Sequence, residues 1–163
     1  MELITIAGIL ILDQITKAVI QFYMVPSQSI RVIEGFFNIT YVLNKGAAFG
    51  IMSQMNSSLR TPFFIVITLS AIGMLSYLMA TTDKKETTLR TAYSMIIAGA
   101  AGNFIDRIFL GEVRDFLDVY WKTYHWPAFN VADSAICIGT GFLIMALYFV
   151  KDNDNKEGLD NIT

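Results

Sequence analysis

Two aspartates, Asp115 and Asp133, are the residues whose type and spacing most suggest chemistry. They lie 18 residues apart, and the chain between them is long enough to turn back and bring the two carboxyl groups together. Two carboxyl groups that share a site do not both ionise easily, so one of them keeps a proton. The ionised partner can then take a proton from water while the protonated partner polarises a carbonyl group, which is aspartic-protease chemistry.

Other hydrolase signatures are missing from the chain. There is no HExxH zinc motif and no GxSxG elbow, and GTGF at 139–142 falls short of the GxGD of another intramembrane aspartic class. One cysteine, Cys137, and one histidine, His125, cannot build a Cys/His zinc cluster. We therefore expect no metal and no cofactor, and we do not expect His125 to act as a ligand or base.

Further polar side chains flank the two aspartates. Asn103, Asp106 and Arg107 follow the i, i+3, i+4 spacing of one helix face, and Asn130 lies one turn before Asp133. An ionisable residue inside a membrane span costs on the order of 3 kcal/mol and is tolerated where it faces the bundle or water, which makes it a functional candidate. We expect the two polar faces to meet.

Each acid also has a structural alternative. Asp115 or Asp133 could cap the fourth helix or pair with Arg107, and Asp118 could replace Asp115 in the catalytic pair. Asp106 could be a structural partner of the polar network.

Asp13 and Lys17, at i, i+4 inside the first apolar segment, are most simply a helix pair that lowers the cost of both charges. A direct contact with substrate is the other interpretation of this pair.

Composition places these residues in a membrane. Of 163 residues, 54% are hydrophobic and 16% charged, and the mean hydropathy is +0.50, too apolar for a soluble protein of this size. Four segments reach the roughly 20 apolar residues that cross a bilayer: about 3–22, 61–82, 89–109 and 128–150. A net charge of −2 gives no basic surface for nucleic acid.

The sequence therefore predicts an all-α membrane protein with four transmembrane helices and one membrane-embedded domain over residues 1–163. The higher density of Lys and Arg on the terminal side favours both termini in the cytoplasm, with a polar tail at 151–163. The first segment lacks a basic leader and holds two charges, so we expect a retained helix rather than a cleaved signal sequence. Thr61 and Pro62 suggest the N-cap and first residue of the second helix.

The extracytoplasmic segment 23–60 is too long to be a simple connection. FNITYVLN at 37–44 alternates as a strand does, and NKG at 44–46 is a turn signal, so we expect a small extracytoplasmic β element. AAFGIM, which follows, could lie against the membrane surface. The connection 110–127 is expected to be a short loop, with an interfacial aromatic belt formed by Tyr120, Trp121, Tyr124, His125 and Trp126.

Five blocks of the sequence carry a family resemblance. They are DQITK at 13–17, NKGAAFG at 44–50, GAAGNFIDR at 99–107, VRDF at 113–116 and FNVAD at 129–133. In this order, and along nearly its full length, the chain resembles the bacterial lipoprotein signal peptidases, or signal peptidase II family.

The resemblance implies that Asp115 and Asp133 are the catalytic pair. It implies that other polar side chains orient the pair or hold substrate: Asn44, Asn103, Arg107, Asn130, Asp13 and Lys17. The implied reaction is hydrolysis of the bond before the diacylglyceryl-modified cysteine of a prolipoprotein. It would occur near the extracytoplasmic face of the bacterial cytoplasmic (inner) membrane. The expected partners are prolipoproteins and membrane lipid, with no nucleic acid, and we expect a monomer.

Two departures from the family pattern stand out. Gly99, Ala100 and Ala101 replace a frequent Gly-Gly-Ala, and Arg114 replaces a second apolar residue before Asp115, whose pKa it could lower. Two rival functions also follow from the residues. A small ion or proton transporter would use intramembrane Asp and Lys, and an assembly subunit would need neither acid.

Overall fold

The computed structural model describes residues 1–46 and 56–160, which form helices and one small sheet. The helices are α1 (Glu2–Tyr23), α2 (Ser57–Thr81), α3 (Thr87–Leu110) and α4 (Val131–Asp160). The strands are β1 (Ser29–Ile33), β2 (Phe37–Asn44), β3 (Val113–Trp121) and β4 (Tyr124–His125). The AAFGIM segment lies outside the described residues.

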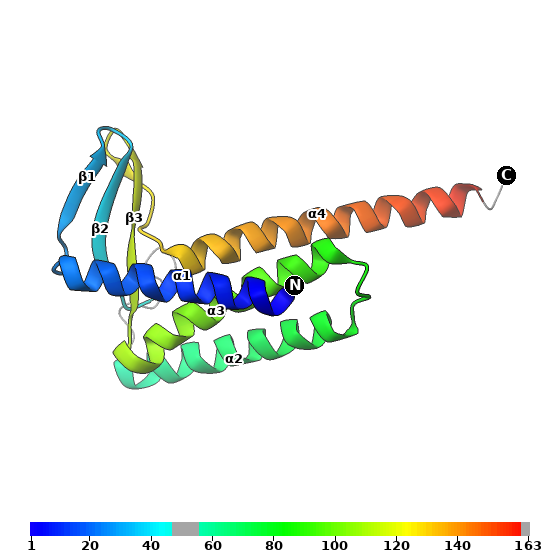
Figure 1. The fold of residues 1–163 in the computed structure, drawn as a ribbon, viewed down its shortest axis with the longest axis horizontal. Helices are drawn as coiled ribbons and strands as arrows, with labels where there is room; N and C mark the ends of the chain where they lie inside the picture. The colour runs from blue at the N-terminus through cyan, green and yellow to red at the C-terminus, as the bar shows by residue number, and fades with distance from the viewer. Residues whose placement is uncertain (47–55, 161–163) are drawn as a thin grey trace.

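The helices run side by side along the long axis of the molecule, and the sheet lies across one end of them (Figure 1). The N-terminus and the last turns of α4 lie at the opposite end. Helix α3 packs against each of the other three helices. Segments that join the helices to the sheet are therefore gathered at a single end of the bundle.

Three helices are long and apolar enough to cross a membrane in the part of the chain that the structure describes: Glu2–Tyr23, Ser58–Thr81 and Val131–Tyr148. Their outer faces carry large apolar side chains such as Leu3, Val66 and Ile144, each more than 60% exposed, as expected for surfaces in contact with lipid. Helix α3 falls short on hydropathy because it is rich in small and polar residues. Many of these are buried among the other helices.

Small residues bring α3 and α4 close together. A Cβ atom at Gly99 would collide with the carbonyl oxygen of Ala132 and with Ile136. A Cβ at Gly102 would lie 2.6 Å from Asp13 Oδ2 and 3.2 Å from Ala132 Cβ. The glycines of GAAGN therefore allow the backbones of α3 and α4 to approach, as small residues do between membrane helices.

Helix α2 begins earlier than the sequence suggests. Asn56 is its N-cap, and the side-chain oxygen of Asn56 accepts a hydrogen bond from Ser58 N at 3.0 Å. Pro62 lies inside the helix rather than at its first position, so the assignment of Thr61 as the cap is wrong. An asparagine cap outside the apolar segment starts the helix, and the missing N–H of Pro62 costs only one backbone hydrogen bond.

The sheet has the antiparallel order β1-β2-β3-β4. Strand β2 coincides with the alternating segment 37–44, which confirms that prediction. Strand β3 replaces the short loop that was expected. Three charged residues within it, Arg114, Asp115 and Asp118, break the apolar alternation and disfavour a strand on propensity. Pairing with β2, at Val42↔Asp115 and Leu43↔Arg114, overrides that preference.

Candidate active site

The start of helix α4 is a reciprocal cap that includes one of the two candidate acids. Asp133 N donates to Asn130 Oδ1 at 2.9 Å, and Asn130 N donates to Asp133 Oδ2 at 3.2 Å. This is the arrangement of a capping box, with an acid at its third helical position. The helix N-terminus also favours a negative charge there. Asp133 therefore takes part in capping α4, as the structural alternative predicted, and this role is compatible with a catalytic one.

Asp115 comes to the same place from the sheet. It is 1% exposed, and its carboxylate accepts hydrogen bonds from Asn44 Nδ2 at 2.9 Å and from Asn130 Nδ2 at 2.7 Å. Burial raises the pKa of Asp115 to about 7, and the neighbouring charge of Asp133 adds to the effect, while the two amide hydrogen bonds oppose it. Asp115 is therefore poised to hold a proton near neutral pH.

Asn103 completes the link between the two acids. Asn103 Nδ2 donates to Asp133 Oδ1 at 2.7 Å, and Asn103 Oδ1 accepts from Asn130 Nδ2 at 3.1 Å. The amide of Asn130 therefore reaches both Asp115 and Asn103, so side chains from β2, β3, α3 and the start of α4 form one network. The structure brings together five of the residues singled out in the sequence: Asn44, Asn103, Asp115, Asn130 and Asp133.

Asp13 and Lys17 lie behind this network and are fully buried. Lys17 Nζ lies 2.9 Å from Asp13 Oδ2, 3.4 Å from Asp106 Oδ2, and donates to Asn103 Oδ1 at 2.9 Å. Asp13 Oδ1 accepts from the backbone of Ala132 at 2.9 Å. These contacts favour the helix-pair interpretation over direct contact with substrate, because every charged group is engaged inside the protein.

Arg107 lies at the edge of the network, near the end of α3. Its guanidinium makes long hydrogen bonds, both 3.4 Å, to the carbonyl oxygens of Asn103 and Gly46. It also lies 4.8 Å from the ring centroid of Phe64 on α2. Both of these hydrogen bonds, to groups of the described residues, are long, so a carbonyl or carboxylate group that entered the site could accept shorter ones.

Arg114 points away from Asp115, because successive side chains of a strand lie on opposite faces. Its guanidinium contacts Asp106, with the closest approach at 2.6 Å, and donates to Gln14 Oε1 at 3.2 Å and Gln21 Oε1 at 2.8 Å. Sequence alone suggested that Arg114 could lower the pKa of Asp115, but that pKa is raised, and the groups that oppose the rise are Asn44, Asn130 and Lys17. The two glutamines were missed; for Gln14, its place within DQITK was the available signal.

Asp118 belongs to a separate cluster on the sheet. It accepts hydrogen bonds from Asn38 Nδ2 at 3.0 Å and Thr40 Oγ1 at 3.1 Å, and lies 2.7 Å from His125 Nδ1. Burial alone would raise the pKa of Asp118, but the hydrogen bonds from His125, Asn38 and Thr40 outweigh it and lower that pKa. The structure thus places Asp118 away from Asp133, as the carboxylate partner of a histidine that stacks on Tyr120.

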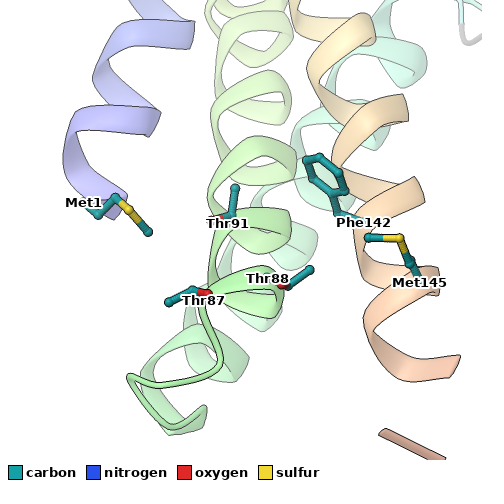
Figure 2. Close-up of a pocket in the computed structure, with 6 residues that line it drawn as sticks. All are labelled: Met1, Thr87, Thr88, Thr91, Phe142 and Met145. Atoms are coloured by element: carbon teal, nitrogen blue, oxygen red, sulfur yellow. The ribbon is translucent and has the colours of Figure 1, made fainter. Parts of the chain in front are cut away.

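Two hollows lie outside the carboxylate network. One, of about 440 Å³, is lined by aromatic side chains around Trp121 and His125 at the far end of the sheet. The other, of about 300 Å³, lies between α1, α3 and α4 (Figure 2). Met1 and Thr87 line it, so it is at the end of the bundle away from the sheet.

Among the described residues, no group of three or more His, Cys, Asp or Glu side chains could hold a metal ion.

A bundle of apolar helices with two amide-held aspartates at one end defines a class, the membrane-embedded aspartic proteases. The chain belongs to the signal peptidase II family, because the family model described as Signal peptidase (SPase) II matches residues 5–149. The lipoprotein signal peptidase of Geobacter sulfurreducens is 51% identical over 151 residues, which cover 93% of this chain and 92% of that protein. The lipoprotein signal peptidase of Geobacter metallireducens is 47% identical over 152 residues, with 93% and 91% covered.

A solved structure agrees with this assignment. A bacterial membrane enzyme determined by the in meso method at 2.3 Å resolution matches with a TM-score of 0.84 and 39% identity, over 95% of this chain and 90% of that one. The chain is thus a membrane aspartyl protease of the signal peptidase II type, and it is a bacterial multi-pass membrane protein. The transporter alternative has no support.

Proposed function

We propose that this protein removes signal peptides from prolipoproteins by cleaving the bond before the diacylglyceryl-modified cysteine, with Asp115 and Asp133 as the catalytic pair. One observation carries the assignment of the pair. Asn130 donates its side-chain amide to Asp115 at 2.7 Å and its backbone N–H to Asp133 at 3.2 Å, so a single residue holds both carboxyl groups.

The two acids take different roles in this proposal. Asp115, with its pKa raised to about 7, holds the proton and polarises the scissile carbonyl. Asp133, which accepts hydrogen bonds from the side-chain amide of Asn103 on α3 and from the backbone N–H of Asn130, is the base and takes a proton from the attacking water. The water oxygen bonds to the carbonyl carbon to give a gem-diol. Its breakdown, with a proton passed to the leaving amine, releases the signal peptide and frees the cysteine amino group.

The remaining polar groups of the site position the substrate. Arg107 and Asn44 lie at the edge of the network and would hold the peptide backbone on either side of the cleaved bond. Asn103 and Asn130 keep the carboxyl groups apart and oriented. Lys17 holds Asn103 through its side-chain oxygen, and Asp13 holds the first turn of α4 through the backbone N–H of Ala132.

We place the protein in the bacterial cytoplasmic (inner) membrane as a monomer, with four spans and both termini in the cytoplasm. Helix α3 then crosses the bilayer shielded by the other helices. The opposed ends of the molecule support this orientation, since the sheet lies at one end, and the N-terminus and the last turns of α4 lie at the other (Figure 1). The acids would then lie at the extracytoplasmic interface, where the apolar part of a signal peptide ends.

The test uses purified protein in detergent and a diacylglyceryl-modified prolipoprotein. Wild type, Asp115→Asn and Asp133→Asn are compared, with Asp83→Asn, in the exposed α2–α3 turn, as the matched control. We expect wild type and the control to cleave the lipidated precursor but not the unlipidated one, and both site variants to fold and to lose cleavage. Cleavage of the unlipidated precursor would contradict the substrate assignment, and cleavage by a folded site variant would contradict the pair.

A further inference from the structure

The contacts of Arg114 join the strand that carries Asp115 to two helices. Its guanidinium contacts Asp106 of α3 through Nε at 3.1 Å and Nη2 at 2.6 Å. The same group reaches Gln14 and Gln21 of α1 at 3.2 and 2.8 Å. Because guanidinium is planar with donors in fixed directions, one side chain fixes the position of β3 against both helices.

The backbone of Arg114 is tied into the same arrangement. Arg114 N donates to Asp106 Oδ2 at 3.0 Å, and Arg114 O accepts from Asn130 Nδ2 at 3.3 Å. That amide is the one that holds Asp115 at 2.7 Å. Any shift of Arg114 therefore moves both the neighbouring acid and the asparagine that links the two acids.

Arg114 also balances the negative charge of Asp106. Asp106 is fully buried between two cations, Arg114 and Lys17. Lys17 also pairs with Asp13 and donates to Asn103. Without Arg114, Lys17 would remain as the cation that pairs with Asp106, and a closer approach of Lys17 to Asp106 would weaken the hydrogen bond from Lys17 to Asn103.

We infer that Arg114 is a positioning residue for the proposed reaction. Its contacts with α1 and α3 fix the position of β3 and therefore of Asp115. By neutralising Asp106, Arg114 also preserves the hydrogen bond from Lys17 to Asn103. This inference rests on the proposed function. It assigns no contact with substrate to Arg114, whose guanidinium lies on the face of β3 opposite Asp115. Substrate affinity should therefore be unaffected, and the turnover of bound substrate should fall.

The experiment measures kcat and KM for the lipidated precursor with wild type, Arg114→Met and Arg114→Lys. Arg31→Met is the matched control, because Arg31 on β1 forms an exposed ion pair with Glu34. For Arg114→Met we expect kcat to fall roughly 10- to 100-fold, as displacement of a reacting group by about 1 Å does, with KM within about twofold of wild type. Arg114→Lys keeps the positive charge but lacks the planar guanidinium with its several donors, so its kcat should lie between those of wild type and Arg114→Met. Arg31→Met should match wild type.

A second variant separates position from stability. Arg114→Met with Asp106→Asn removes both charges and leaves Asp13 and Lys17 balanced, so it should fold even where Arg114→Met does not. Its kcat should remain low because the guanidinium contacts that join β3 to α1 and α3 are still lost. Wild-type kcat in either folded Met variant, or in Arg114→Lys, would overturn the inference. A wild-type protein that cleaves nothing would instead overturn the proposed function.

Discussion

The side-chain amide of Asn130 donates to Asp115 Oδ1 over 2.7 Å, and Asn130 also stands at the N-cap position of the helix that carries Asp133. The same residue therefore sets where α4 begins and how the two acids are spaced. A helix cap is normally a matter of stability alone. Here the cap also determines the geometry of the site.

Substitution of Asn130 should separate these two roles. In Asn130→Asp the new side chain can still cap α4, because aspartate is as good a cap as asparagine. It replaces a fully buried amide donor with a third carboxylate beside Asp115, so we expect the cap of α4 to remain, stability to fall through repulsion between the buried acids, and cleavage to fall at least 100-fold, about the loss on removing a single preorganised donor. Asn130→Ala should lose cleavage and also about 1 kcal/mol of stability. Initial rates and unfolding curves in one detergent measure both, and wild-type rates in Asn130→Asp would contradict the linking role.

The raised pKa of Asp115 makes stability depend on pH. The folded protein holds this proton up to about pH 7, whereas the unfolded chain loses it near 3.8, the ordinary pKa of an aspartate. The folded state therefore binds more protons between these values, and the free energy of unfolding falls as pH rises through this window. Asp115→Asn removes this dependence. Relative to wild type, it should gain stability with rising pH, by up to about 4 kcal/mol above pH 7. Thermal unfolding from pH 4 to 8 tests this, with Asp83→Asn as control, and parallel curves would contradict it.

Cleavage should follow the same titration. If Asp115 supplies the proton that polarises the scissile carbonyl, the rate should decline as pH rises above about 7 and the group ionises. The measurement is kcat/KM for the lipidated precursor across pH 5 to 9. A rate that stays level to pH 9 would show that Asp115 does not act as the protonated partner.

Asp118 should be dispensable for cleavage. Its hydrogen bonds with Asn38, Thr40 and His125 hold the sheet together, away from Asp133. Asp118→Asn and His125→Gln should keep cleavage within about twofold of wild type and lose roughly 1 kcal/mol of stability, the usual size for a partly exposed pair. Gel assays beside Asp115→Asn measure the contrast. Loss of cleavage in folded Asp118→Asn would return Asp118 to the catalytic pair.

The contact between α3 and α4 should tolerate no side chain at Gly99. In Gly99→Ala the added methyl meets the Ala132 carbonyl and Ile136, so the helices must separate. We expect a loss of about 1–3 kcal/mol and reduced cleavage, because α3 carries Asn103 and α4 carries Asp133. Gly141→Ala is the control: nothing lies within 4 Å of its added Cβ, so it should fold as well as wild type or better. Equal unfolding temperatures for the two variants would contradict the close approach.

The sequence determined the membrane setting, the strand at 37–44 and the family, and it marked Asp115 and Asp133 as candidates. These features depend on composition, local periodicity and short motifs, which can be read along the chain. The tertiary structure decided which groups meet. It turned 113–121 into a strand through pairing with β2, it sent Arg114 to Asp106 rather than to Asp115, and it joined Asp118 to His125. It also started α2 at Asn56 rather than at Thr61. Pairings between distant residues and the face on which a side chain lies are set by packing of the whole chain, so local pattern alone does not predict them.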